Sequence, residues 1–439
     1  MTTVIVPTII KETQIVEATR IVQETHIVQQ TRIVIAEVTR IVQETIIILP
    51  APTTIPTAGV TAAPVPAPTA VGAPFPSAKI PTAQPSGIAP MLPRAQHTAT
   101  LLSDGRVLLV GGSISPNVQL ADVEIFDPAT GISTQVAALH TARHGHTATL
   151  LIDGRVLVVG GYNHSQGSLS DSEVYDPSAD VWTVVPMQAS HGVEHTATLM
   201  KDGRVLVVGG AVGNGLITNR VDIFDPQINS WYIAMPLESG RASQTAQLLE
   251  DGRVLVAGGG DVSGFPAGGD ALVYDPPTDS WTATGPMVYP RIFSKSVRLS
   301  DGSVLVVGGI NLEDTLYGNP PHNALTSAEI YVTTLNGWEA TGDLSQARYG
   351  HVMILLQDGR ALVAGGARIG DCCWTNNLYS YEVEEYDPQT CLWEAVEELP
   401  RAGVYSAGVL LPDGRVFISG GETGLYGTNF LSDIWLYTP

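Results

Sequence analysis

Cysteine and lysine are both scarce in this 439-residue sequence, which contains three cysteines and four lysines. Only 15% of the residues are charged, and 43 acidic residues against 22 basic ones give a formal net charge of -21. Such a surface repels nucleic acids and anionic membranes, so the sequence predicts neither as a partner. No apolar run approaches the roughly 18 residues that a membrane-spanning helix needs, so no transmembrane segment is expected.

The three cysteines are Cys372, Cys373 and Cys391, which lie close together in the sequence. A disulfide that joins Cys372 or Cys373 to Cys391 is one interpretation, and three free thiols are the other. The N-terminus has no basic region and carries Pro7 inside its apolar stretch, so it is not a recognisable signal peptide. A cytosolic protein and a secreted one whose signal peptide lies outside this numbering therefore stay open as alternatives.

Glycine and proline, by contrast, are abundant, with 45 and 30 residues, which favours short strands and turns over helices. From about residue 91 onward a unit of near 49 residues recurs seven times. Each unit has an apolar segment such as HTATLL, an Asp-Gly turn, a run such as VLVVGG, a segment such as VEIFDP, and in most units a tryptophan. The Asp-Gly turns begin at residues 104, 153, 202, 251, 301, 358 and 413.

Each part of this unit predicts a strand or a turn. Asp-Gly between two apolar runs is typical of a tight hairpin turn, since glycine accepts a positive φ. The VLVVGG runs are apolar at nearly every position, as in a strand that is buried on both faces. Asp-Pro opens the next turn, and the tryptophan begins a fourth strand. Four antiparallel strands repeated seven times predict an all-β fold, a seven-bladed β-propeller.

The R-x-x-H…DGR-VLVVGG…YDP…W unit resembles the kelch repeat, in the bacterial style found also in the propeller domain of galactose-oxidase-like proteins. The resemblance covers about 350 of the 439 residues and implies a kelch-type propeller over residues 80–439. Another all-β repeat, such as a solenoid, is the alternative. The last unit ends after its third strand, so residues 80–91 are expected to supply the missing edge strand, where proline is tolerated.

Arginine recurs near the start of the repeat unit and gives a first set of candidate site residues. A ring of arginines and histidines around the propeller axis is one interpretation, because it would bind an anionic ligand. In the alternative, each side chain pairs with a carboxylate or carbonyl group and belongs to the architecture of the repeat. The arginines are Arg94, Arg143, Arg241, Arg291 and Arg348.

Three adjacent units carry longer segments after their glycine pairs, and these segments break the symmetry of the repeat. Long loops on a rigid scaffold are typical of recognition surfaces, here for a glycan or a surface protein. Insertions that pack only on themselves are the alternative. The candidate partner-binding residues on these segments are Tyr317, Trp374, Tyr379 and Tyr426.

The sequence shows no motif that indicates catalysis. We find no Ser-His-Asp spacing, paired acidic motif, phosphate loop or Cys/His metal spacing. Galactose oxidase needs copper held by tyrosines and histidines together with a cysteine cross-linked to a tyrosine. That ligand set cannot be placed here residue by residue. The sequence therefore predicts a protein that is not an enzyme and has no cofactor and no metal.

Residues 12–48 repeat a different unit, Thr-x-Ile-Val-x-x, at a spacing of six. A helix would turn successive Ile-Val pairs in three directions, whereas an extended strand keeps them in register. Such a long strand needs partners, and other copies of the chain would supply them, so residues 1–48 are predicted to drive self-assembly. A disordered tail is the alternative. The assembly residues would be Ile15, Val16, Ile21, Val22, Ile27, Val28, Ile33, Val34, Ile41 and Val42.

Residues 49–79 are rich in proline, alanine and threonine, which is typical of an extended linker. The sequence thus predicts an assembly strand, a stiff spacer and a propeller. We interpret this as a non-enzymatic extracellular or cell-surface protein that forms a homo-oligomeric filament, sheath or stalk and displays its propeller. A monomeric secreted module that binds glycans or proteins is the alternative, and a copper-dependent carbohydrate oxidase is a further one.

Overall fold

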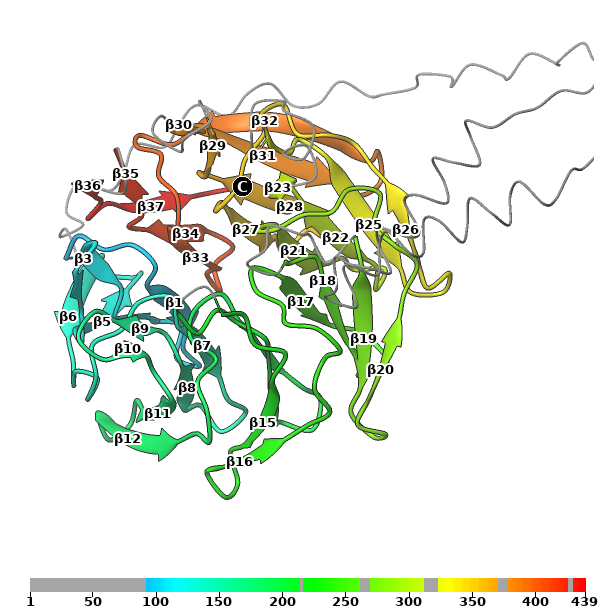
Figure 1. The fold of residues 1–439 in the computed structure, drawn as a ribbon. Coiled ribbons are helices and arrows are strands. Elements are labelled where there is room, and N and C mark those ends of the chain that lie inside the picture. The colour runs from blue at the N-terminus through cyan, green and yellow to red at the C-terminus, as the bar shows by residue number, and fades with distance from the viewer. Residues whose placement is uncertain (1–91, 214–215, 261–268, 312–322, 370–376, 425–428) are drawn as a thin grey trace, which may run out of the picture. The chain divides into compact units, whose positions relative to one another are not determined.

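The computed structural model describes residues 92–213, 216–260, 269–311, 323–369, 377–424 and 429–439. They belong to one compact unit, residues 77–439, and all of their regular secondary structure is β-strand. Within these ranges no helix is long and apolar enough to cross a membrane. Seven sheets stand around a common axis (Figure 1), which confirms the predicted seven-bladed propeller.

The innermost strand of each blade contacts the innermost strands of both neighbouring blades, so these strands surround the axis. The second strand pairs with it antiparallel through the Asp-Gly turn. The innermost strands are β1 (Thr98–Leu101), β7 (Thr147–Leu150), β13 (Thr196–Leu199), β17 (Thr245–Leu248), β21 (Lys295–Arg298), β27 (Val352–Leu355) and β33 (Ala407–Leu410). The second strands are β2 (Val107–Val110), β8 (Val156–Val159), β14 (Val205–Val208), β18 (Val254–Ala257), β22 (Val304–Val307), β28 (Ala361–Ala364) and β34 (Val416–Ser419).

The third strand of each blade, and the fourth strand of the first six blades, lie toward the outside of the ring. The third strands are β5 (Val123–Asp127), β11 (Asp171–Asp176), β15 (Val221–Asp225), β19 (Ala271–Asp275), β25 (Ala328–Val332), β31 (Glu382–Asp387) and β37 (Ile434–Tyr437). The fourth strands are β6 (Ile132–Gln135), β12 (Val181–Pro186), β16 (Ser230–Ile233), β20 (Ser280–Ala283), β26 (Gly337–Ala340) and β32 (Leu392–Glu398).

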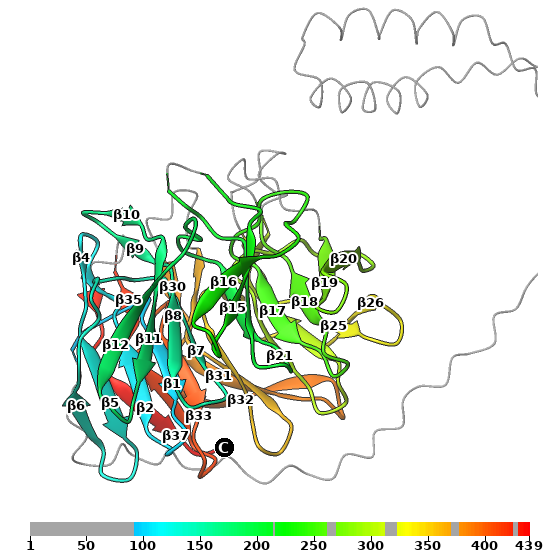
Figure 2. The same cartoon turned by 90° about the horizontal axis from the view of Figure 1, so that it is seen from below.

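The segments after the glycine pairs lie on one face of the ring, which we call the glycine-pair face. Several form short hairpins, and β9–β10 projects clearly on one side of the ring in Figure 2. The Asp-Gly turns lie on the opposite face, because successive strands are antiparallel. The hairpin strands are β3 (Ser113–Ser115), β4 (Val118–Gln119), β9 (Tyr162–Asn163), β10 (Gly167–Ser168), β23 (Ile310–Asn311), β24 (Asn323–Ala324), β29 (Ala367–Ile369), β30 (Asn377–Tyr379), β35 (Glu422–Thr423) and β36 (Asn429–Phe430).

The hydrophobic core lies between neighbouring blades. Every residue of the second strands is buried, as their almost entirely apolar runs predict. Each core combines residues of two successive blades. Leu108 and Val123 of the first blade, for example, pack in one cluster with Val156 and Tyr175 of the second. Stability is therefore distributed around the ring rather than held in one centre.

The ring is closed by hydrogen bonds between backbones of successive blades. The second glycine of each pair donates its N–H to a carbonyl group of the next blade, as in Gly112 to Arg143 at 2.9 Å. The same bond recurs at every blade boundary, and Gly421 of the seventh blade donates to Arg94 of the first at 2.9 Å. The two ends of the described chain are thus tied together beside the axis.

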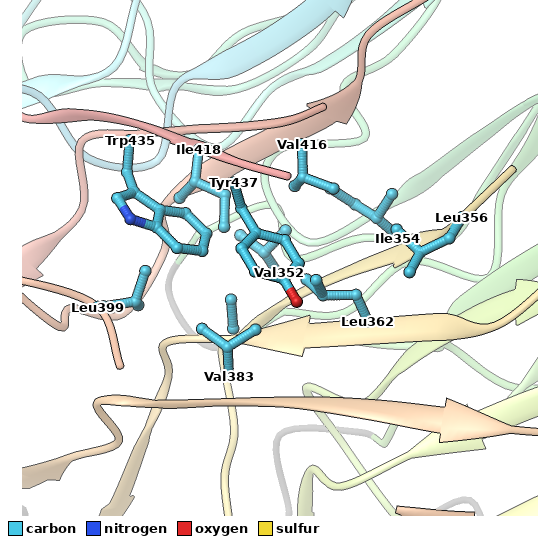
Figure 3. Close-up of a cluster of buried hydrophobic side chains, with 11 residues drawn as sticks. Val352, Ile354, Leu356, Leu362, Val383, Leu399, Val416, Ile418, Trp435 and Tyr437 are labelled. Carbon is cyan, nitrogen blue, oxygen red and sulfur yellow. The ribbon is translucent and has the colours of Figure 1, made fainter. Parts of the chain in front are cut away.

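The seventh blade has three strands among the described residues, in the order β33-β34-β37. Its last tyrosine, Tyr437, donates its hydroxyl hydrogen to Glu385 in the sixth blade at 2.8 Å. Glu385 is buried and also pairs with Arg360. Figure 3 shows Tyr437 and Trp435 packed among side chains of the sixth blade. The predicted fourth strand, residues 80–91, lies outside the described residues.

Candidate binding site on the glycine-pair face

The five arginines that the sequence singles out are buried, with at most 3% of their surface exposed. Each donates through Nη1 to the carbonyl group of the first glycine in its own blade, as Arg143 does to Gly160 at 2.9 Å. Four of them also pair with a buried glutamate on the third strand of the same blade. This geometry favours the architectural interpretation, because the guanidinium groups already bind carbonyl and carboxylate groups of their own blade.

The third blade uses a histidine in place of the arginine. His191 contacts the carbonyl group of Gly209 at 2.7 Å through Nδ1 and the carboxylate of Asp222 at 2.8 Å through Nε2. The sequence interpretation missed this residue, since counting back from the glycine pair reaches Gly192 instead. Aspartate at 222, where four other blades carry glutamate, is the signal that could have revealed it.

Two residues before each innermost strand, the backbone adopts a left-handed conformation. We call these seven residues the axial ring. Most of them donate their N–H to the equivalent residue of the preceding blade, as Ser243 does to the carbonyl group of Glu194 at 3.0 Å. Gly145 and Gly350 tolerate this conformation, whereas the other side chains are strained by it. The axial ring consists of Gln96 (φ 55°), Gly145 (φ 63°), Glu194 (φ 61°), Ser243 (φ 60°), Phe293 (φ 55°), Gly350 (φ 62°) and Tyr405 (φ 58°).

Aromatic side chains gather on one part of the axial ring. The centroid of the Phe293 ring lies 6.3 Å from that of Tyr349 and 6.4 Å from that of Tyr405. Gly350 lies beside them, and a Cβ atom added there would be 3.5 Å from the Tyr405 ring. Tyr349 is buried, but Phe293 and Tyr405 keep partly exposed surface. They therefore offer an aromatic surface beside the axis.

Two carboxyl groups lie near this aromatic surface. Desolvation by burial raises the pKa of Glu422 to about 7. Burial also raises the pKa of Glu194, while a hydrogen bond from the Ser243 hydroxyl lowers it. Burial raises the pKa of Tyr405 well above its ordinary value, and Tyr349, Glu194 and Glu422 raise it further. At neutral pH the carboxyl group of Glu422 is thus able both to donate and to accept a hydrogen bond.

Comparison with known proteins identifies the repeat. Residues 96–309 match the KLHDC2/KLHL20/DRC7 Kelch-repeats domain. The propeller is built of kelch repeats. An F-box/kelch-repeat protein of Arabidopsis thaliana is 32% identical over 116 residues, which cover 25% of this chain and 28% of that relative. The chain therefore matches less than a third of that relative's length.

A solved structure of a fungal alcohol oxidase of the AA5 family, in complex with copper, shares the fold of this kelch propeller. It aligns with a TM-score of 0.63 and 18% identity over 80% of this chain and 75% of that one. At this identity the likeness concerns the fold alone. Among the residues that the structure describes, no group of three or more His, Cys, Asp or Glu side chains could hold a metal ion.

The remaining candidate residues of the kelch propeller lie on the longer segments or near them. Tyr379 ends β30, and its hydroxyl group donates to the carbonyl group of Gly424 at 3.1 Å, which links the sixth and seventh blades. Tyr317, Trp374 and Tyr426 lie outside the described residues. So do Cys372 and Cys373, and the disulfide with the exposed Cys391 stays a prediction.

Proposed function

We propose that this protein acts by binding rather than by catalysis, and that it binds a partner protein on the glycine-pair face around Phe293 and Tyr405. The kelch repeats support the binding role, and one observation supports the place. Both bulky aromatic residues hold a left-handed backbone conformation, where glycine stands in the second and sixth blades. Strain of this kind costs about 1–2 kcal/mol per residue and is concentrated at functional sites.

Glycine at both positions is expected to remove the binding surface and keep the fold, because glycine is the residue that this conformation favours. The F293G/Y405G variant should retain its partner at least about tenfold less well than the wild type, since aromatic anchors dominate interface energies. The measurement is quantitative capture of proteins from an extract of the source organism on immobilised protein. Variant Y232A is the control, because Tyr232 is an exposed aromatic residue on the outer strand β16.

Three outcomes of this experiment are informative. Loss of the same proteins from F293G/Y405G but not from Y232A supports the proposal. Equal capture by all three proteins shows that the aromatic surface is not the binding site. Binding to a glycan array that only F293G/Y405G loses would instead assign a glycan as the ligand.

We also propose that residues 1–48 join copies of the chain into a filament or stalk outside the cell, which displays the propeller. The support is the hexad sequence, since its β-branched residues favour extended strands that need partners. This segment lies outside the described residues.

Truncation tests this second proposal. Full-length protein is expected to form fibres or defined clusters in negative-stain electron microscopy, whereas a variant that lacks residues 1–48 forms separate rings, because the unpaired strands are gone. Separate rings in both samples would contradict self-assembly and leave the binding role unaffected.

A further inference from the structure

The innermost strand of the fifth blade differs from the other six. Its first residue, Lys295, pairs with the last residue of β22, and its last residue, Arg298, pairs with the first. The same registers in the other blades identify the equivalent residues. Those at the position of Lys295 are Thr98, Thr147, Thr196, Thr245, Val352 and Ala407. Those at the position of Arg298 are Leu101, Leu150, Leu199, Leu248, Leu355 and Leu410.

Both cationic side chains are exposed and have no partner among the described residues. No hydrogen bond or ion pair joins either side chain to any group there, whereas the turn arginines pair with their own aspartates. The strand lies beside the propeller axis, where the surrounding blades desolvate the exposed Lys295 side chain and lower its pKa. Two unpaired cations on one innermost strand are unexpected in a chain with a net charge of -21.

Lys295 also breaks an interaction that the repeat makes elsewhere. In the first two blade boundaries the threonine at this position contacts a histidine of the next blade, Thr98 with His146 and Thr147 with His195, both at 3.0 Å. The equivalent histidine beside Lys295 is His351, which is 1% exposed and has no hydrogen-bond partner on either ring nitrogen among the described residues. Lysine at position 295 therefore gives up a stabilising contact and leaves a second polar group unpaired.

We propose that Lys295 and Arg298 form a binding site for an anionic ligand beside the propeller axis, one that carries carboxylate or phosphate groups. Side chains three residues apart on a strand start about 10 Å apart and leave it on opposite faces, so the site suits an elongated ligand with two anionic groups better than a single small ion. Such a ligand supplies a counter-charge that the described residues do not offer. This site lies on β21 and does not depend on the partner proposed for Phe293 and Tyr405.

The K295T/R298L variant tests the site, because it restores residues that other blades carry at these positions and is therefore expected to fold. Binding of a hexaglutamate peptide and of inorganic phosphate to the full-length protein is measured by isothermal titration calorimetry. We expect the variant to bind at least about tenfold more weakly than the wild type, since two charge-assisted contacts are lost. Binding to the wild type should also weaken with added salt. Variant K201T/R401A is the matched control, because it removes the same net charge from exposed positions.

Loss confined to K295T/R298L supports the site. If the peptide binds and phosphate does not, the ligand is an acidic peptide segment, whereas the reverse assigns a small phosphate-bearing ligand. Equal weakening in K201T/R401A would attribute binding to overall charge and overturn the proposal. Failure of the wild type to bind either probe would overturn it as well. Thermal unfolding of both variants establishes that the compared proteins are folded.

Discussion

Replacing Glu329 by alanine is expected to lower the free energy of unfolding by about 3–5 kcal/mol, because it leaves a buried guanidinium group without its counter-charge. Arg291 and Glu329 are both 1% exposed, and their ion pair measures 2.5 Å. Glu329 also accepts the backbone N–H groups of Val288 at 2.7 Å and Tyr289 at 3.1 Å. Urea unfolding monitored by tryptophan fluorescence measures the change.

The matched control replaces the acidic residue of a solvent-exposed ion pair. Asp251 and Arg253 lie 2.7 Å apart on an Asp-Gly turn, with side chains 43% and 36% exposed. Variant D251A should lose about 1 kcal/mol or less, because exposed ion pairs contribute little to stability. Similar losses in E329A and D251A would contradict the architectural role of the buried arginines.

Alanine at Gly111 is expected to lower the free energy of unfolding by about 2–5 kcal/mol, the sum of backbone strain and a steric clash. Gly111 has a φ of 56°, and an added Cβ would lie 2.6 Å from the carbonyl oxygen of Arg143. That oxygen accepts the N–H of Gly112 at the boundary between the first two blades. Displacing this carbonyl oxygen therefore breaks one of the hydrogen bonds that join successive blades. Differential scanning calorimetry measures the loss.

Gly167 separates the two causes of that loss. Its φ is 81°, yet an added Cβ would meet nothing within 4 Å. Backbone strain alone should therefore lower the free energy of unfolding of variant G167A, by about 1–2 kcal/mol. If G111A were no less stable than G167A, the close approach of the neighbouring blade would not be the reason for the glycine.

The two stability predictions concern contacts that recur from blade to blade, whereas the two proposed sites concern residues found in single blades. The buried arginines, the glycine pairs and the interblade hydrogen bonds recur in most or all blades and hold the ring together. The proposed sites instead consist of residues that no other blade carries at the equivalent position, namely Phe293, Lys295, Arg298 and Tyr405. These four residues are not needed to build a blade, because other blades form with different residues at the same positions. A fold shared with an oxidase at 18% identity likewise leaves function to such individual residues.

The sequence was sufficient to predict the first three strands of each blade, their order and the number of blades, because these depend on local patterns that recur seven times. Asp-Gly turns, fully apolar second strands and glycine pairs each have one dominant structural interpretation. For Arg94 and its equivalents the sequence left two interpretations open, and in the structure these arginines make contacts within their own blades.

Only the tertiary structure showed which side chains meet, since those contacts join residues of different blades or lie far apart in the sequence. It placed His191 against Asp222 and Tyr437 against Glu385. It also brought Phe293 and Tyr405 together from blades that are not adjacent. Lys295 was visible in the sequence, but its place beside the axis, without a counter-charge among the described residues, depends on the packing of seven sheets around one axis. That packing is a property of the closed ring, which a single repeat cannot specify.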